Sequence, residues 1–295
     1  MSQSDGAARG IAIMVATMAV FAVQDGVSKH LAERYSPVFV TMIRYWFFAL
    51  FVVALSARRA GGLRAAARSA RPALQWARGA LLALEIVVMI SGFALLGLVE
   101  SHAVFAVYSL IVTALAGPVL GEKVGWRRWA AIGVGFLGVL IVLRPGLRLF
   151  DPLALIPLAA AAMFALYHLL TRLANAADSA ATSFFYTGVG GAVTMTLIGP
   201  FFWTPMVGWD WGWMAMLCVT GMTGHYMLIK ALEAAEASVV QPFTYLQLVF
   251  GAAVGVAVFG ESVDAPTILG ATLIVAAGLF TLWREHQKRR AARGR

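Results

Sequence analysis

The residues of this chain that could do chemistry stand inside long apolar stretches, where an ionisable side chain has to be paired or wetted. Glu85 and Arg44 both lie well within such stretches, at depths that permit a salt bridge. A charge at the centre of an inserted helix costs about 2.5 to 3.5 kcal/mol unless it is compensated. We therefore expect Glu85 and Arg44 either to pair and fix two helices together or to line a wet cavity that binds a solute or a proton.

Three further ionisable residues lie in apolar stretches. Asp25 precedes Lys29 by four residues, so the two can pair along one helix face, and Asp25 would then be structural. His168 lies near the end of its stretch, where it can reach interfacial water, and we group it with the structural or gating residues. His225 is deeper, and a buried histidine is either satisfied by its own surroundings or in contact with a solute.

A second group of candidates offers rings and amides rather than charge. Rings supply apolar contact and attract cations, while amides orient the polar end of a solute. Together with Glu85 and His225, the residues expected to bind substrate are Gln24, Phe105, Tyr108, Ser109, Tyr167, Gln241, Tyr245 and Gln247. Pro242, next to Gln241, is expected to free backbone carbonyls as a hinge or else to be an ordinary first-turn proline.

The elements that must position these groups are membrane-spanning helices. Hydrophobic residues make up 61% of the chain and charged residues 13%, a composition typical of a polytopic membrane protein. Apolar stretches of about 20 residues, the length that crosses the hydrocarbon layer, recur ten times. The spans are expected near residues 9–29, 37–56, 75–97, 102–120, 127–144, 152–172, 180–201, 211–230, 238–259 and 266–284.

The net charge of +9 is distributed as a topology signal. Odd-numbered connections between the expected spans hold four lysines and arginines, whereas the termini and even-numbered connections hold eighteen. The positive-inside rule therefore places both termini in the cytoplasm, and no nucleic-acid partner is expected. The chain has a single cysteine, Cys218, so disulfides and thiolate metal clusters within one chain are excluded, and no cofactor is expected.

The chain repeats itself. The segment Phe21-Ala-Val-Gln-Asp-Gly-Val-Ser-Lys29 returns as Phe164-Ala-Leu-Tyr-His-Leu-Leu-Thr-Arg172. Gly121-Glu122 and Gly260-Glu261 each end an apolar helix, and they are separated by nearly the same length of chain as the two copies of the motif. We therefore divide the chain into repeats over residues 1–146 and 147–295. Five spans in each repeat force the second copy to enter the membrane from the opposite side, an arrangement typical of alternating-access transporters.

These features resemble the drug/metabolite transporter superfamily of the EamA type, and the resemblance covers essentially the whole chain. It is carried by the five-plus-five duplication, the helix-ending Gly-Glu followed by a span with small residues, and the Phe-Ala-x-x-x-x-x-Ser-Lys opening. By overall likeness the chain is most similar to the bacterial exporters of aromatic amino acids. The resemblance implies a cavity bordered by helices 1, 3, 4, 6, 8 and 9, with helices 5 and 10 at the periphery.

The expected fold is thus an all-α membrane protein of ten transmembrane helices in two inverted repeats. The expected function is the export of amino acids, aromatic ones first, or of similar small amphipathic metabolites across the lipid bilayer. Export of cationic or aromatic drugs is the alternative, because the same cavity chemistry would accept them. An intramembrane enzyme is disfavoured, since the chain lacks an H-E-x-x-H motif, a phosphate-binding loop and a Gly-x-Ser-x-Gly elbow. The oligomeric state is left open.

Overall fold

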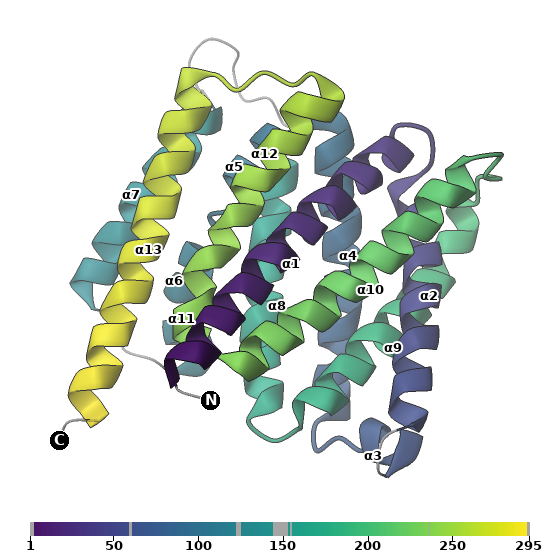
Figure 1. Ribbon diagram of the computed structural model, residues 1–295, viewed down its shortest axis with the longest axis horizontal. Helices are drawn as coiled ribbons and strands as arrows, with labels where there is room; N and C mark the ends of the chain where they lie inside the picture. The colour runs from purple at the N-terminus through teal and green to yellow at the C-terminus, as the bar shows by residue number, and fades with distance from the viewer. Residues whose placement is uncertain are drawn as a thin grey trace.

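The computed structural model describes the backbone of residues 3–58, 61–121, 125–143, 153, 155–235 and 237–293, which form an all-helical bundle (Figure 1). The helices of the first half are α1 (Gln3–Ala32), α2 (Pro37–Ala57), α3 (Gly62–Ala67), α4 (Pro72–Leu96), α5 (Leu98–Phe105), α6 (Tyr108–Leu120) and α7 (Trp126–Leu143). Those of the second half are α8 (Leu155–Asn175), α9 (Ala180–Ile198), η2 (Gly199–Phe202), α10 (Asp210–Ala234), α11 (Ala237–Val240), η3 (Gln241–Tyr245), α12 (Leu246–Phe259) and α13 (Ala265–Arg293).

Within these ranges, eight helical stretches are long and apolar enough to cross a membrane. They are Ala7–Ala32, Pro37–Ala57, Pro72–Leu96, Leu98–Leu120, Leu155–Asn175, Ala180–Phe202, Gln241–Phe259 and Ala265–Arg284. Each coincides with one of the expected spans to within a few residues. The other two expected spans correspond to α7 and α10, which are helical and pack along α13 and α1. That α7 and α10 also cross the membrane stays a prediction.

The pair formed by α7 and α13 stands at one edge of the bundle, as the resemblance implied (Figure 1). Their backbones touch where two glycines face each other. A Cβ on Gly138 would lie 2.6 Å from the carbonyl oxygen of Gly270, and a Cβ on Gly270 would lie 2.4 Å from that of Gly138. Small residues therefore set this helix contact, as is common within membranes.

Two of the expected continuous spans are interrupted, at equivalent positions of the two repeats. The span expected over 102–120 breaks between α5 and α6, where Val107 donates its N–H to Val104 rather than to a residue four positions back. The span expected over 238–259 contains the 3₁₀ segment η3, with Pro242 as its second residue. Aligning the repeats so that Gly121 matches Gly260 brings the two interruptions into register. Interrupted helices of this kind are typical of the substrate sites of transporters.

The two ends of the bundle are connected by α4. Next to its first turn, Ala70 donates its N–H to Asp178 in the loop after α8, 2.7 Å away. Directly after its last turn, Leu98 donates its N–H to Glu261 in the loop after α12, 2.9 Å away. We call the end that holds Glu261 the Lys29 end and the end that holds Asp178 the Arg172 end, after the residues that close the two copies of the repeated motif.

Candidate functional site

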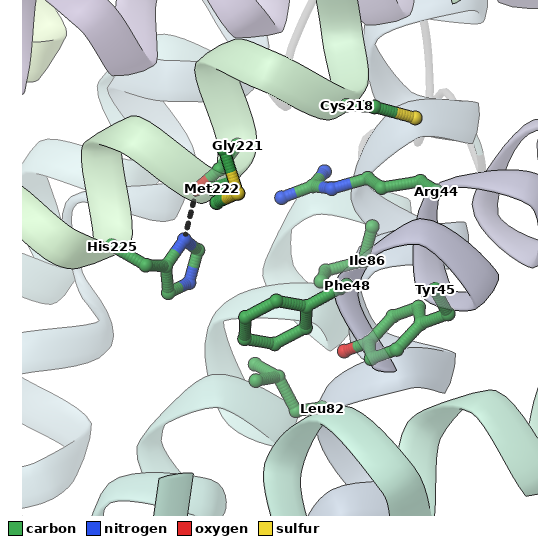
Figure 2. A pocket seen from close by; sticks show the side chains of 9 residues that line it. All are labelled: Arg44, Tyr45, Phe48, Leu82, Ile86, Cys218, Gly221, Met222 and His225. Atoms are coloured by element: carbon green, nitrogen blue, oxygen red, sulfur yellow. Dashed lines mark hydrogen bonds between the residues drawn. The ribbon is translucent and has the colours of Figure 1, made fainter. Parts of the chain in front are cut away.

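A pocket lies where α2, α4 and α10 meet (Figure 2). Its lining combines one charged group, one imidazole, two aromatic rings and a thiol with aliphatic side chains. The lining residues are Arg44, Tyr45, Phe48, Leu82, Ile86, Cys218, Gly221, Met222 and His225. Of the residues singled out in the sequence, Arg44 and His225 line this pocket directly.

No carboxylate lies within ion-pair distance of Arg44 in the described part of the chain, so the salt bridge to Glu85, one of the two expected arrangements, is not formed, although the two groups interact electrostatically. Both side chains are buried, with exposed fractions of 9% for Arg44 and 3% for Glu85. The guanidinium extends toward Gly221 and Met222 on α10, as Figure 2 shows. The pocket therefore contains a cation whose charge the surrounding carboxylates do not neutralise by contact.

His225 is held by its own helix and by rings. Its Nδ1 lies 2.8 Å from the carbonyl oxygen of Gly221, and its ring lies 5.3 Å from that of Phe21 and 5.6 Å from that of Phe48. Gln24 is nearby: its Oε1 is buried without a hydrogen-bond partner and lies 3.1 Å from where a Cβ on Gly221 would be. An unpaired buried amide oxygen is costly, and it is available to a donor on a solute.

Four of the aromatic candidates gather elsewhere, between α5, α6 and α8. Phe105 and Tyr108 meet Phe164 and His168, with ring centroids 5.3 Å apart for Phe105 and Phe164 and 5.0 Å for Tyr108 and Phe164. His168 is 4.6 Å from Phe164 and 5.7 Å from Tyr108. Tyr167 stacks on Phe164 at 6.0 Å. Rings at these distances stabilise one another and present a flat apolar surface.

Three candidates lie around η3 rather than in the pocket. The hydroxyl of Ser109 shares a hydrogen bond of 2.6 Å with that of Tyr245, which joins the two repeats. A Cβ on Gly278 would lie 1.7 Å from the Tyr245 hydroxyl, so α13 makes room for it. Gln241 is exposed, and it does not line the pocket.

Asp25 does not pair with Lys29, contrary to the expected contact along α1. Its carboxylate accepts a hydrogen bond from the Gln247 side-chain amide on α12, 2.9 Å away, and lies 3.3 Å from Nε2 of His102 on α5. The ring of His102 lies tilted against that of Phe93, with centroids 5.1 Å apart. His102 was not among the residues singled out in the sequence, although the alignment of the repeats on their Gly-Glu pairs matches it to Gln241, which was.

Lys29 pairs instead with Glu261, across the two repeats. The Glu261 carboxylate also accepts the N–H groups of Leu98 and Val99 at the start of α5, both at 2.9 Å. Burial alone would raise the pKa of Glu261, but the bonds from Lys29 and from these two N–H groups together hold it below the usual range. Glu122, its counterpart in the first repeat, lies outside the described residues.

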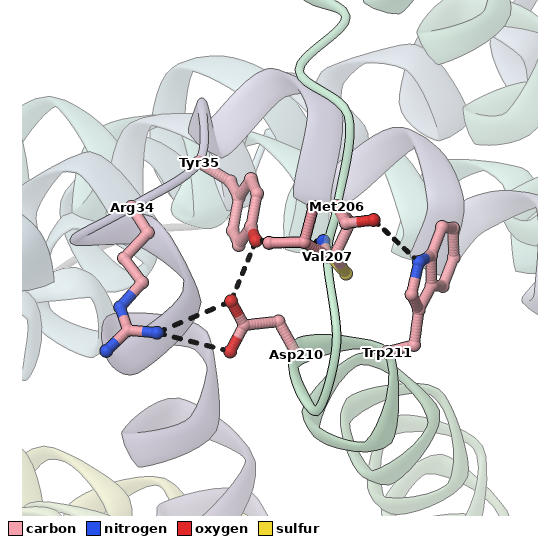
Figure 3. Close-up of polar contacts among 6 residues, drawn as sticks. All are labelled: Arg34, Tyr35, Met206, Val207, Asp210 and Trp211. Atoms are coloured by element: carbon pink, nitrogen blue, oxygen red, sulfur yellow. Dashed lines mark hydrogen bonds and ion pairs between the residues drawn. The ribbon is translucent and has the colours of Figure 1, made fainter.

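A second contact closes the Lys29 end next to α10 (Figure 3). The Tyr35 hydroxyl donates to Asp210 at 2.7 Å and accepts the N–H of Val207 at 3.3 Å. Arg34, mostly exposed, lies 3.4 Å from the same carboxylate. The hydrogen bond to Asp210 raises the pKa of Tyr35 above its usual value. The loop after α1 is thus tied to the beginning of α10.

At the Arg172 end the tie runs between α4 and the loop after α8. Asp178 accepts hydrogen bonds from Ser69, from the N–H of Ala70 and from Gln75. Burial would raise the pKa of Asp178, but these bonds outweigh it and lower the pKa. Arg78 lies inside α4 and is 1% exposed.

The comparison with known proteins agrees with a duplicated chain. The EamA-like transporter family matches residues 8–144 and again residues 152–283. The chain belongs to this family. The EamA-like chain is accordingly a multi-pass membrane protein, and its repeats are those of a transporter family rather than of an enzyme family. A solved crystal structure superimposes on this chain with a TM-score of 0.60 at 17% identity. The match covers 94% of this chain and 96% of the solved one, which shows the shared fold.

Relatives of this EamA-like chain carry several solutes. An S-adenosylmethionine uptake transporter of Rickettsia prowazekii is 25% identical over 94% of this chain and 93% of its own length. A riboflavin transporter of Vibrio cholerae is 32% identical over 61% of each chain. A pseudopaline exporter of Pseudomonas aeruginosa is 24% identical over 91% of this chain and 94% of its own. The family resemblance is confirmed, whereas these relatives do not single out the exporters of aromatic amino acids.

Proposed function

We propose that this chain exports small solutes that combine a carboxylate with a flat ring, aromatic amino acids being the simplest of them. The single observation that carries this proposal is the Arg44 guanidinium, which lies buried beside the rings of Tyr45 and Phe48 without an acidic partner in the described chain. A carboxylate is the group that a buried guanidinium binds best, because it accepts two parallel hydrogen bonds. The rings beside it suit a flat apolar group.

The solutes of the relatives support the flat ring of this class, and one of them supports the carboxylate as well. S-adenosylmethionine contains an amino-acid carboxylate and a purine ring, and riboflavin contains a fused aromatic ring system. Transporters related to this chain therefore carry large flat solutes. Drug export is the alternative, and Arg44 disfavours those drugs whose only charge is positive.

The transport cycle that we propose is alternating access across the bacterial inner membrane. Ten helices would cross, including α7 and α10, with both termini in the cytoplasm and the Lys29 end facing the periplasm, as the distribution of lysine and arginine indicates. Rocking of the two repeats would expose the pocket to one side at a time. One relative is an uptake transporter and another is an exporter. The direction of transport therefore needs its own test, which is efflux of the solute from preloaded cells.

The decisive experiment is counterflow in proteoliposomes that contain only this protein. Vesicles loaded with unlabelled phenylalanine, S-adenosylmethionine or riboflavin are diluted into the same labelled solute, and uptake above equilibrium reports carriage. We expect counterflow of phenylalanine, inhibited by other aromatic carboxylates but not by phenethylamine, which keeps the ring and lacks the carboxylate. Equal inhibition by phenethylamine would contradict the proposal.

Arg44→Gln tests the residue itself. A hydrogen bond to a charged group contributes about 1.5 to 3 kcal/mol, so half-saturation should require at least about tenfold more phenylalanine. The preference over phenethylamine should disappear as well. Arg64→Gln, on the exposed face of α3, is the matched control and should behave as the parent protein. A preference for the carboxylate that survives in Arg44→Gln would remove Arg44 from the site.

A further inference from the structure

Asp25, His102 and Gln247 form a buried polar cluster outside the pocket, built from three helices. Asp25 comes from α1, His102 from α5 and Gln247 from α12, so both repeats contribute. Asp25 is 7% exposed and His102 is 4% exposed. An acid and an imidazole kept together at this depth are unusual, because an unpaired charge is expensive there and ionisable groups inside membranes mark pathways for ions or protons.

The contact between the two groups is close but imperfect. Nε2 of His102 lies 3.3 Å from the Asp25 carboxylate, within ion-pair distance, yet it has no hydrogen-bond partner in the described chain. Gln247 satisfies one carboxylate oxygen. Gly251 leaves the room that the imidazole fills, since a Cβ there would lie 2.6 Å from the ring. The geometry keeps an acid and a base in reach of one another without bonding them firmly.

Few other charges stand close to the cluster. The titratable and charged groups of the surrounding helices include Lys29 on α1, Arg44 on α2, Glu85 on α4, Glu100 on α5, His168 on α8, His225 on α10 and Glu261 after α12. Lys29 and Glu261 neutralise each other one turn further along α1. Glu85 interacts electrostatically with Asp25, so the charge of the Asp25 and His102 pair depends on the proton that the two residues hold between them and on the charge of Glu85.

We propose that Asp25 and His102 form a proton-binding site that couples the solute transport proposed above to proton movement. One proton resides either on the imidazole, facing the Asp25 carboxylate, or on the carboxyl group, and it leaves to water when the pair separates.

The position of the site explains how proton binding would be coupled to the transport cycle. Asp25 lies on α1, and its partners lie on α5 and α12. Lys29 and Glu261 join the same three elements at the Lys29 end, because Glu261 follows α12 and caps the start of α5. Opening this end must move α1 away from α5 and α12, which separates Asp25 from His102 and admits water. The protonated pair therefore favours the closed Lys29 end.

Experiments in proteoliposomes distinguish solute transport itself from its coupling to protons. Counterflow at equal pH on both sides needs no proton gradient, whereas accumulation driven by a pH gradient does. We expect the parent protein to show both. Asp25→Asn and His102→Gln should keep counterflow and lose driven accumulation. His30→Gln, at the end of α1 against Trp213, should keep both. Driven accumulation that persists in either of the first two variants would overturn the site, and so would counterflow without driven accumulation in the parent.

A measurement without solute separates this proposal from the proposed function. Absence of counterflow for every solute tested would overturn the substrate class, and the proton site is then decided by nitrogen-15 NMR of the five histidines of the chain. We expect one signal to vanish in His102→Gln, to titrate in the parent protein and to shift its midpoint in Asp25→Asn. A His102 signal that does not titrate, or that ignores Asp25→Asn, overturns the proton site whatever the solute is.

Discussion

The two copies of the repeated motif differ more in their surroundings than in their pattern. In the first copy, Gln24, Asp25 and Lys29 are all buried, with exposed fractions of 5%, 7% and 8%. In the second copy, the equivalent Tyr167 and His168 are half-buried and Arg172 is exposed. The first copy is thus packed among helices at the Lys29 end, whereas the second copy is more exposed toward the Arg172 end, where the loop after α8 is tied to α4 through Asp178.

This difference indicates that the Lys29 end is the closed end in this conformation. At the Lys29 end, α1 meets α5 and α12 through charged and amide groups, whereas at the Arg172 end α8 meets α5 and α6 through rings. Charged contacts that are lost on opening can be replaced by water, and ring contacts are replaced less well. The Lys29 end is therefore suited to open and close, and the ring cluster is suited to remain.

The largest effect is expected from Glu261→Gln, which removes the charge that closes the Lys29 end. Three donors converge on this carboxylate, from Lys29, Leu98 and Val99. Each hydrogen bond to a charged group contributes about 1.5 to 3 kcal/mol, so the closed end should open at least about tenfold more often. The measurement is the alkylation rate of Ser28→Cys, which is 1% exposed, in a Cys218→Ser background.

The matched control is Glu33→Gln, since Glu33 lies at the same end and is exposed. It should leave the alkylation rate at position 28 unchanged. Equal rates for Glu261→Gln and the parent protein would show that the ends differ in packing alone and that the ion pair does not hold the Lys29 end closed.

Exchanging the two charges tests whether Lys29 and Glu261 act only as an ion pair, and its expected effect is no larger than that of Glu261→Gln. If Lys29 and Glu261 were only an ion pair, the double variant Lys29→Glu with Glu261→Lys would restore closure. The N–H groups of Leu98 and Val99 require an anion at position 261, because the beginning of a helix carries partial positive charge. We expect the double variant to be as open as Glu261→Gln. Protection of Ser28→Cys in the double variant would show that the cap on α5 is unimportant.

The spans and the repeat could be predicted from the sequence, because apolar length and a shared motif are local properties. The interruption at Val107 could not, since a break in backbone hydrogen bonding leaves the apolar stretch unchanged, whereas Pro242 pointed to the one at η3. Depth along a helix was also predictable, which is why Arg44 and Glu85 were placed at compatible levels.

Partners were harder to predict than positions. Sequence does not give the rotation of one helix about its axis relative to another, so the pairs Arg44 with Glu85 and Asp25 with Lys29 were both wrong. His102 was missed because its two polar partners come from distant parts of the chain. A comparison of the repeats position by position would have pointed to it, through its counterpart Gln241.

The smallest expected effect is the response of the Lys29 and Glu261 ion pair to pH. Measuring it distinguishes this ion pair from the Asp25 and His102 pair. The folded pKa of Glu261 is lowered, so the contribution of its charge is complete above the ordinary glutamate range, near pH 4.3, and is lost only as the pH falls through the lowered value. Between about pH 8 and about pH 5 the contribution of the Glu261 charge should therefore stay constant.

The measurement is alkylation at position 28, normalised to the unfolded protein at each pH. In His102→Gln the alkylation rate should not change over this range. In the parent protein it should change, because the proposed proton site of Asp25 and His102 responds to the proton concentration. A slope of equal size in both proteins would place the pH response on the ion pair and remove the distinction between the two groups.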